Sequence, residues 1–537
     1  MPNYLSPGVY MEEVDRGTKP IESVGTAVAA FIGYTERAVD TRNGESVSLL
    51  GKPTLVTNWS QYVQKFGGFM QGAYLPDSVY GYFANGGTIC YVVSIRTVGT
   101  SDDPAMTVPA KTLVLADGEK GVKLLEFTAK QGGVVGNNIE VEVKLSPAAP
   151  AGAPEGEAEG GKKAAPGAAA PSEFTVNVRV SGQVRETFPG LTTAKGDKNV
   201  VTVLQTQSSL ISATLVGKSE LAPASGTYAL AGGEVKTKAI SLVDYKGSVS
   251  ERRGLGGLEA FDDVTMICAP DLMSSYQAGE IDMKGVQAVQ QALIDYCELV
   301  RYCFAILDAP PALMPQEVKE WRMQVNYDTT RAALYYPWIE VADMTGAKGR
   351  TRMVPPSGHM AGIYARVDDT RGVHKAPANE IVRTSLGLEV QVTKGEHDLL
   401  NPIGVNVIRS FPGRGIRVWG ARTLSSDASW RYINVRRLFS MIEESIERGT
   451  QWVVFEPNDQ FLWGRVRRDV RAFLTTIWRT GALFGTTAEE AFYVKCDEET
   501  NPPELRDLGQ LVTEIGIAPV KPAEFVIFRV SQWSPES

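Results

Sequence analysis

The stretch FPGRGIRVWGAR, residues 411–422, has the residue types of a phosphate site, with three glycines to free the backbone and three arginines to bind an anion. A phosphate-binding loop carries GK[ST] after its glycines, or has GxGxxG spacing at the start of a helix, and neither pattern is present. The glycines are more typical of tight turns before the strand IRVWGAR. We therefore predict a structural or subunit-contact role for this stretch, with an unrecognised ligand site as the alternative.

A second group of cations lies in WGRVRRDVRAFL, residues 463–474, which we predict to be helical. Residues three and four apart are neighbours on a helix surface, so Arg465 and Arg468 share one face, and Arg467 and Arg471 form a second row. Such rows either face solvent or dock on an acidic protein surface. The spacing alone does not decide between these two roles.

A third group lies in TGAKGRTRMVPPSGH, residues 345–359, which gathers Lys348, Arg350, Arg352 and His359. Such a cluster could bind an anion in an α/β enzyme. The sequence has no HExxH, no EF-hand loop and no GxSxG nucleophile elbow, which are the patterns that would support metal or acyl-transfer chemistry. An enzyme is therefore the minor alternative.

The remaining titratable residues favour structural roles. His374 in GVHKAP and His397 in GEHDLL are expected in polar loops. The adjacent carboxylates at 262–263 and 368–369 are typical of turns and helix ends. We expect no catalytic residue, no metal ion and no cofactor, and hence a protein that is not an enzyme.

Composition limits the partners and the compartment. A net charge of −8 and an isoelectric point near 5.3 argue against a nucleic-acid partner, which usually calls for a basic footprint. The longest apolar runs fall short of the ~18 residues of a membrane span, so we expect no direct membrane insertion. The acidic N-terminus lacks the apolar core of a secretory signal. The five cysteines form no CxxC pair, which predicts reduced, buried, structural thiols.

Strands and helices alternate from residue 260 onward, and two further buried strands precede them. This alternation predicts right-handed crossover units around a mostly parallel sheet. The early strands, GTAVAAFIGYTERA and GTICYVVSIR, are too few for a sheet of their own and are expected to join it. The later predicted elements are strands in 262–270, 302–310 and 450–457, and helices over 283–300, 315–326, 433–449 and 459–480.

Residues 98–250 have a different texture, rich in Thr, Val, Ser and Gly, which predicts a β domain inserted into the α/β domain. NIEVEVKL and FTVNVRV each alternate apolar and polar residues and are expected to pair as a hairpin. Between them, residues 146–172 form an Ala/Pro/Gly tract that cannot bury a core and is expected to be a disordered surface loop.

Both ends of the chain are predicted to be extended arms. SPGVYMEEVD carries Val9, Tyr10, Met11 and Val14 after a Pro-Gly turn, and GQLVTEIGIAPVKPAEFVIFRV is expected to form two strands separated by a stiff bend at Pro519 and Pro522. The last strand is apolar on both faces, which is an aggregation hazard unless another strand pairs with it. Arms of this kind suit strand addition between subunits, although pairing within one monomer is the alternative. The apolar residues of the last strand are Phe525, Val526, Ile527, Phe528 and Val530.

Six motifs in order along the chain are similar to those of one family. YLSPGVYMEEV, GTAVAAFIGYT, PGRGIRVWGARTL, WRYINVRRLFSMIEESI, FEPND with a following LW, and IAPVKPAEFVIFRV together resemble the sheath proteins of contractile injection systems. That family includes contractile phage tails, R-type pyocins and extracellular injection particles. The resemblance covers residues 1–97 and 252–537. The acidic start and the KPAEFVIFRV ending look closest to the extracellular branch, with a phage tail sheath as the alternative.

The resemblance implies a fold of the α/β class with α+β elements. A discontinuous sheath core is expected at 21–97 plus 252–518, and an outer, mostly β insertion domain at 98–251. Residues 1–20 and 519–537 are expected to be the two linker arms.

The resemblance also implies a mechanism without catalysis. Subunits of the family form six-fold rings stacked around an inner tube and contract from a metastable extended state. The arms, Val9–Val14 and Glu524–Val530 here, are expected to add strands to neighbouring subunits, and Arg465, Arg467, Arg468 and Arg471 become candidates for the inner-tube contact. Expected partners are other copies of the chain, the inner tube protein, baseplate and cap or terminator proteins, and a sheath paralogue where one exists. Assembly is expected in the bacterial cytoplasm, as part of a released or intracellular tail-like particle.

Overall fold

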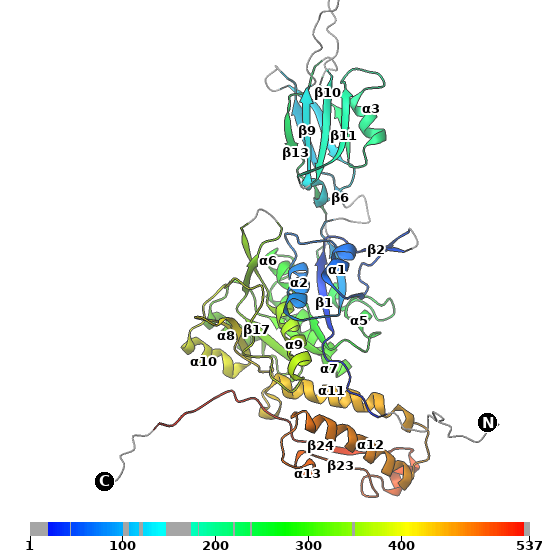
Figure 1. Ribbon diagram of the computed structural model, residues 1–537, viewed down its shortest axis with the longest axis vertical. Helices are drawn as coiled ribbons and strands as arrows, with labels where there is room; N and C mark the ends of the chain where they lie inside the picture. Colours follow the sequence, from blue (N-terminus) through cyan, green and yellow to red (C-terminus); the bar gives the residue numbers. More distant parts are fainter. Residues whose placement is uncertain are drawn as a thin grey trace, which may run out of the picture.

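An eight-stranded sheet forms the middle tier of the computed structural model (Figure 1). Its strand order is β22-β21-β17-β16-β15-β1-β5-β4. The pairs from β21 through β5 are all parallel, while β22 and β4 run antiparallel at the two edges. The predicted parallel α/β sheet, joined by the two early strands, is therefore confirmed. The strands are β1 Ala29–Thr35, β4 Thr54–Val56, β5 Cys90–Thr97, β15 Met266–Cys268, β16 Phe304–Asp308, β17 Ala332–Tyr336, β21 Val405–Phe411 and β22 Gly415–Val418.

The structure describes most of the chain, and every structural statement below refers to that part. The described residues are 20–42, 45–99, 107–117, 122–145, 173–180, 182–217, 221–236, 239–345 and 349–530.

Both faces of the sheet are buried, which is why its strands are near-continuous apolar runs. Alternate side chains of β1 point to opposite faces, so Ala30 and Ile32 lie in one hydrophobic core, and Ala29 and Phe31 lie in the other. One core packs under α6, α7, α8 and α10, and the second packs under α1, α2 and α9. These helices are α1 Trp59–Phe66, α2 Leu75–Asn85, α6 Leu272–Gln277, α7 Met283–Val300, α8 Pro315–Val325, α9 Ser357–Arg371 and α10 Lys394–Leu400.

Short elements fill the connections of this tier. They are β2 Val39–Arg42, β3 Glu45–Ser48, α4 Leu242–Lys246, α5 Gly254–Leu258, β18 Ile339–Ala342, β19 Thr351–Val354 and β20 Gly387–Leu388. The position of His397 differs from the prediction of a polar loop, because GEHDLL forms α10. Thr393 and Glu396 make a capping box at its start, and His397 is buried inside it.

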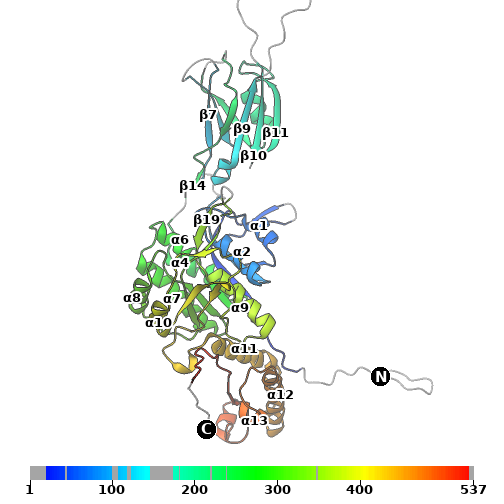
Figure 2. The same cartoon turned by 60° about the vertical axis from the view of Figure 1, so that its left-hand side comes forward.

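The upper tier in Figures 1 and 2 is a β module with its own hydrophobic cluster, drawn from residues 110–230. A four-stranded sheet, β11-β10-β9-β13, and a three-stranded sheet, β12-β8-β7, supply its walls. The predicted hairpin is confirmed, since β9 and β10 pair antiparallel from Ile139–Val180 to Leu145–Phe174. The tract 146–172 lies outside the described residues. The elements are β6 Thr107–Val108, β7 Lys111–Leu115, β8 Lys123–Ala129, β9 Ile139–Leu145, β10 Phe174–Val180, β11 Gln183–Leu191, α3 Val200–Gln207, β12 Ile211–Leu215, β13 Gly226–Ala229 and β14 Glu234–Val235.

The lower tier packs two long helices against a two-stranded sheet (Figure 1). α11 lies between this lobe and the middle tier, and its first residue, Ile433, is buried in the core above. The elements are α11 Ile433–Gly449, α12 Gln460–Arg479, α13 Ala488–Ala491, β23 Phe492–Lys495, α14 Pro503–Asp507 and β24 Glu514–Ile517.

The strand predicted at 450–457 is wrong. Residues Gln451–Val453 form one 3-10 turn, and Phe455 has a positive φ of 67° and is fully exposed. The apolar residues that suggested a strand have local partners instead, since Trp452 lies 4.2 Å from the Arg465 guanidinium and Val453 packs on the lobe. The segment is the short connection between two packed helices, so no neighbouring strand is available to it.

No helix among the described residues is both long and apolar enough to cross a lipid bilayer.

Candidate assembly surface

The root of the C-terminal arm is held tightly along the lower tier. After β24, Ala518 N–H donates to the Ala491 carbonyl at 2.9 Å, and Val520 N–H donates to the Ala482 carbonyl at 3.1 Å. Asn434, in the first turn of α11, donates its side-chain amide to the Val520 carbonyl at 3.2 Å. The chain therefore runs from the lobe to the start of α11 in a fixed path, with Pro519 and Pro522 supplying the predicted bend.

Glu524 ends this path in a polar clamp. Arg422 donates to its carboxylate through two nitrogens, at 2.9 and 2.8 Å. Asn401 donates its side-chain amide at 2.7 Å, and the Tyr432 hydroxyl donates at 3.0 Å. The three donors come from the end of α10, the chain after β22 and the residue before α11. The clamp therefore joins the arm to three elements that are far apart in the sequence.

Electrostatics favour the ionised clamp. Burial would raise the pKa of Glu524, but the hydrogen bonds from Arg422 and Asn401 and the Arg422 charge outweigh it and hold that pKa below its ordinary value. Burial and the Glu524 carboxylate raise the pKa of Tyr432, so its hydroxyl stays a donor. The Asn406 side chain accepts from the Arg422 N–H at 2.7 Å and donates to the Arg422 carbonyl at 2.8 Å. Because Asn406 lies in β21, these bonds tie the clamp to the middle sheet.

Beyond Glu524 the arm contacts almost nothing. Phe525, Val526, Ile527, Phe528 and Val530 are between 68% and 94% exposed. Of the two strands predicted at this end of the chain, the first is β24, whereas the second is absent from the single chain: residues 525–530 form no strand, and no other described segment pairs with their backbone. In Figure 1 this end of the chain runs outward from the body. An apolar stretch with a free backbone therefore projects from a fixed point.

The matching N-terminal arm residues, Val9, Tyr10, Met11 and Val14, lie outside the described residues. The first described segment begins in the lower tier, where Ile21 packs in the hydrophobic cluster and Val24 N–H donates to the Ser445 hydroxyl at 3.0 Å.

The four arginines of the two predicted rows on α12 have different surroundings, and each row has one exposed and one partly buried member. Arg467 donates to the Cys496 carbonyl at 3.0 Å and is half-buried against the lobe. Arg471 lies 3.3 Å from the Glu489 carboxylate, and Arg468 lies 3.0 Å from the carboxylate of its neighbour Asp469. Arg465 stacks over the Trp452 ring. Of the four, Arg468 and Arg471 are the exposed ones.

The glycine-arginine stretch is a hairpin, as its spacing predicts. Gly413 and Gly415 have φ values of 70° and 74°, which only glycine adopts easily, and they turn the chain from β21 into β22. Arg414 lies above the Phe411 and Trp419 rings, 5.6 and 5.9 Å from their centroids.

The third cation group has no anion pocket in the described chain. Arg352 donates to the Met70 carbonyl at 3.0 Å and pairs with Asp77 at 3.4 Å. His359 is fully buried, and burial lowers its pKa to about 4. Arg350 is exposed, and Lys348 lies outside the described residues. The described members of this group therefore have separate partners and do not converge on a common anion site.

The five cysteines are free and buried, which confirms the prediction of structural thiols. Among the described residues, no group of three or more His, Cys, Asp or Glu side chains is placed to hold a metal ion.

Sequence reasoning missed the Glu524 clamp, because it treats the run from Ala523 as an apolar strand before Arg529. One signal was available. A single carboxylate between Pro522 and four apolar residues needs a partner when it is buried, and Arg422 in the arginine-rich stretch could have been proposed as that partner.

Residues 254–424 match the family described as phage tail sheath protein central domain, and residues 425–532 match the phage tail sheath C-terminal domain. The tail sheath protein of Vibrio phage KVP40 is 26% identical over 393 residues, which are 66% of this chain and 54% of that protein. The tail sheath protein of Salmonella phage ViI is 26% identical over 285 residues, which are 49% of this chain and 43% of that protein. The chain thus spans about half the length of these relatives.

Solved structures align with nearly the full length of the chain. The helical sheath of the anti-feeding prophage in its contracted state aligns with a TM-score of 0.57 at 23% identity, covering 98% of this chain and 99% of that one. The contracted sheath complex of the extracellular contractile injection system PVC aligns with a TM-score of 0.54 at 24% identity, covering 99% of both chains. With two adjoining family matches from residue 254 to residue 532, the chain belongs to the phage tail sheath family.

Proposed function

We propose that this chain is the structural subunit of a contractile sheath, which polymerises as stacked hexameric rings around an inner tube. The observation that carries the proposal is the C-terminal arm, whose apolar residues 525–530 are exposed while Glu524 is clamped. A strand held at its root and free beyond it suits donation to a neighbouring copy. In the same way, Val9–Val14 would form the second donated arm.

Strand donation supplies a linkage that survives large movements. Each backbone hydrogen bond contributes about 0.5–1.5 kcal/mol net, and each buried Phe, Ile or Val side chain contributes about 1.5–3 kcal/mol. A six-residue strand therefore holds neighbours together while the cores rotate and slide. The clamp at Glu524 would carry load from the strand to the middle sheet.

Contraction would release energy stored in assembly. The sheath would form in an extended, metastable lattice and shorten when a baseplate triggers it, because the contracted lattice buries more surface between copies. A preference of a few kcal/mol per subunit is sufficient, since every copy contributes it. Contraction would drive the inner tube through a target envelope. No step requires a catalytic residue, a metal or a cofactor.

The tiers would divide this work. Residues 21–97 and 252–518 form the proposed sheath core, and 98–251 form an insertion domain on the outside of the tube, where its size is tolerated. The exposed arginines of α12, Arg468 and Arg471, remain the better candidates for the inner-tube contact, with Arg465 and Arg467 beside them. Baseplate and cap or terminator proteins would bind the two ends of the lattice, and assembly would occur in the bacterial cytoplasm.

The extracellular injection branch is the preferred setting, and a contractile phage tail is the alternative. The preference rests on the acidic start and the KPAEFVIFRV ending. Whole-chain alignments with the anti-feeding prophage and PVC sheaths are consistent with it in fold.

The test is assembly of the purified chain, examined by negative-stain electron microscopy and sedimentation. Wild-type protein is expected to form rings or tubes, and a chain truncated after Glu524 is expected to remain a folded monomer. Soluble monomers of wild type under all conditions would refute the proposal.

A point substitution separates strand pairing from apolar contact. Ile527→Pro removes a backbone donor and restricts the chain, whereas Ile527→Val keeps both the donor and the apolar surface. Assembly is expected to fail for the proline variant and to persist for the valine variant. Equal assembly by both variants would show that the arm does not act as a paired strand.

A further inference from the structure

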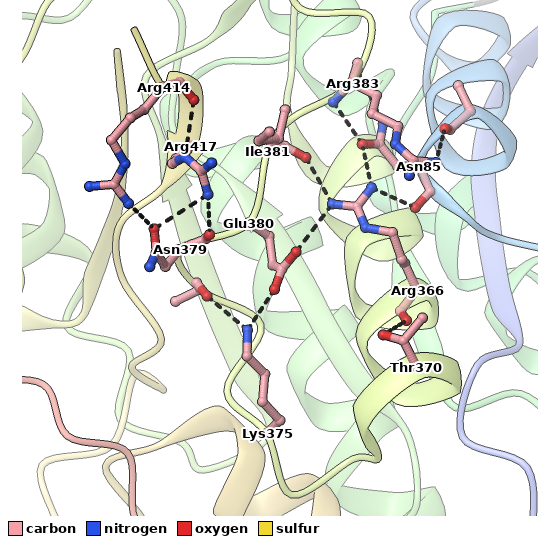
Figure 3. Close-up of polar contacts among 12 residues, drawn as sticks. Asn85, Arg366, Thr370, Lys375, Asn379, Glu380, Ile381, Arg383, Arg414 and Arg417 are labelled. Carbon is pink, nitrogen blue, oxygen red and sulfur yellow. Dashed lines mark hydrogen bonds and ion pairs between the residues drawn. The ribbon is translucent and has the colours of Figure 1, made fainter. Parts of the chain in front are cut away.

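Five cations form a basic face on the middle tier, around the β21–β22 hairpin and the loop after α9 (Figure 3). Among the labelled residues of that view, Glu380 is the one carboxylate, and it accepts from Lys375 at 2.7 Å. We call Arg366, Lys375, Arg383, Arg414 and Arg417 the basic face; Arg383 and Arg414 are exposed, and the other three are partly buried.

Neutral oxygens hold most of these cations in place. Arg417 donates to the Asn379 carbonyl at 2.7 Å, whereas Arg366 donates to the Asn85 carbonyl at 2.9 Å and also pairs with Glu380 at 3.6 Å. Arg414 donates to the Asn379 side-chain oxygen at 3.0 Å. Such acceptors fix a guanidinium without neutralising it. Burial lowers the pKa of Arg366 and the Arg383 charge lowers it further, while the Glu380 carboxylate opposes both.

Exposed carboxylates gather in the lower tier. Residues 488–514 contain two cations, Lys495 and Arg506, against a much larger number of acids. Within the described chain Glu489 pairs with Arg471 and Glu499 pairs with Lys495, and no ion pair joins these acids to the basic face. We call the following exposed residues the acidic lobe: Glu489, Glu490, Glu498, Glu499, Glu504, Asp507 and Glu514.

We propose that the basic face of one copy docks on the acidic lobe of a neighbouring copy. This inference rests on the proposed function, because the donated arm brings the two surfaces together. A cavity of about 700 Å³ is lined both by the basic-face loop, at Lys375 and Asn379, and by the arm root, at Lys521 and Glu524. The arm therefore leaves the molecule beside the basic face.

The acidic lobe lies on the segment that carries β23 and β24. β23 and β24 form a two-stranded sheet in the described chain, which a further strand would extend. Six extended residues, 525–530, span about 20 Å at roughly 3.3 Å per residue. A strand added to the neighbour's β23–β24 sheet brings the basic face of the donor to within one strand length of the neighbour's acidic lobe.

Opposite charges give the contact its direction. A contact that repeats through a ring or helix joins two different surfaces of the same chain, head to tail. Attraction between the basic face and the acidic lobe favours this arrangement, while repulsion between two lobes opposes the two-fold alternative. Such steering raises association rates by about 10–10³-fold and is weakened by salt.

Charge reversal on each surface tests the contact. Arg383→Glu with Arg414→Glu reverses two exposed cations of the basic face, and Glu498→Lys with Asp507→Lys reverses two exposed acids of the lobe. Each double variant is expected to assemble at least about tenfold more slowly than wild type in light scattering at low salt. Unchanged unfolding curves verify that each variant is folded.

Mixing the two double variants is the decisive part of the experiment. An equimolar mixture of the two double variants can alternate, because the reversed face of one variant meets the reversed lobe of the other. Co-assembly at a rate near that of wild type is expected. Lys123→Glu with Lys195→Glu, in the upper tier, is the matched control, since it changes the net charge by the same amount as the basic-face variant and should assemble normally.

The outcomes separate this inference from the proposed function. If wild type assembles and truncation after Glu524 prevents assembly, but the reversed variants assemble at the wild-type rate, the docking of the basic face is refuted and the sheath proposal stands. Failure of the mixture to assemble would also refute the pairing. If wild type does not assemble under any condition, both proposals fall.

Discussion

Two apolar stretches of this chain have similar compositions and opposite surroundings. β16, with the sequence FAILD, is at most 4% exposed at every position. In the arm segment FVIFRV, residues 525–530, every apolar side chain is at least 68% exposed. β16 lies between two parallel neighbours, β15 and β17, which satisfy its backbone. Among the described residues the arm has no such neighbours. The contrast shows that an apolar stretch is buried only where the fold also offers strands to pair with, and that the arm still needs a partner.

The largest effect is expected when β16 loses volume. Ile306→Ala removes a side chain that is 1% exposed and should lower the free energy of unfolding by about 2–5 kcal/mol. Ile527→Ala makes the same chemical change in the arm and should shift it by less than about 0.5 kcal/mol. Urea denaturation followed by circular dichroism measures both. Similar losses in the two variants would mean that the arm is packed in solution.

The sequence predicts the regular parts of the fold well, for a local reason. α7 and α12 carry helical apolar spacing together with aspartate caps at Asp282 and Asp459, so their bounds could be predicted closely. The segment at 450–457 could not be predicted in this way, because Trp452 stacks with Arg465 and Val453 packs in the hydrophobic cluster of the lower tier without pairing as a strand. The clamp of Glu524 by Arg422 joins residues that are 102 positions apart, and no local pattern encodes such a pair.

The second expected effect is on local opening at the root of the arm, residues 518–524, between the packed lobe and the exposed strand. Glu524→Gln removes the charge that Arg422 binds and should lower the free energy of local opening by about 1.5–3 kcal/mol, while global unfolding changes less. Hydrogen exchange of residues 518–524 measures this opening, with Glu514→Gln as an exposed control. Exchange equal to that of wild type would show that the clamp does not hold the arm.

Acid should release the same clamp. The pKa of Glu524 is lower in the folded chain than its ordinary value of 4.5. The stabilisation that the ionised carboxylate gives the clamp is therefore complete above pH 4.5 and is lost as the pH falls through the lowered pKa. The Glu524→Gln variant should lack this acid-dependent increase in exchange, which separates the clamp from general acid unfolding.

A second pH effect is expected in the core and not in the arm. Burial lowers the pKa of His359 from 6.5 to about 4, so the folded chain binds fewer protons than the unfolded chain between these values. Stability from this residue is complete above pH 6.5 and falls as the pH decreases, by about 2 kcal/mol at pH 5. Comparing wild type with His359→Gln at pH 7.5 and pH 5 isolates this contribution from Asp271 and Asp308, whose pKa values burial raises to about 7. Equal pH dependence of the two proteins would contradict the assignment.

The smallest effect on the monomer is expected at the tip of the arm, and there it is the most informative. Phe528 is 85% exposed and Val530 is 94% exposed, so replacing both with serine should change the free energy of unfolding by less than about 0.5 kcal/mol. The same double variant should assemble poorly, because in the lattice these side chains would be buried at about 1.5–3 kcal/mol each. Unfolding curves and sedimentation on the same samples make the comparison, with serine at the exposed Val249 and Val216 as the control. A stability loss at the tip that matched the assembly loss would place the arm in the monomer's own core, whereas a loss confined to assembly means that its burial depends on a second copy.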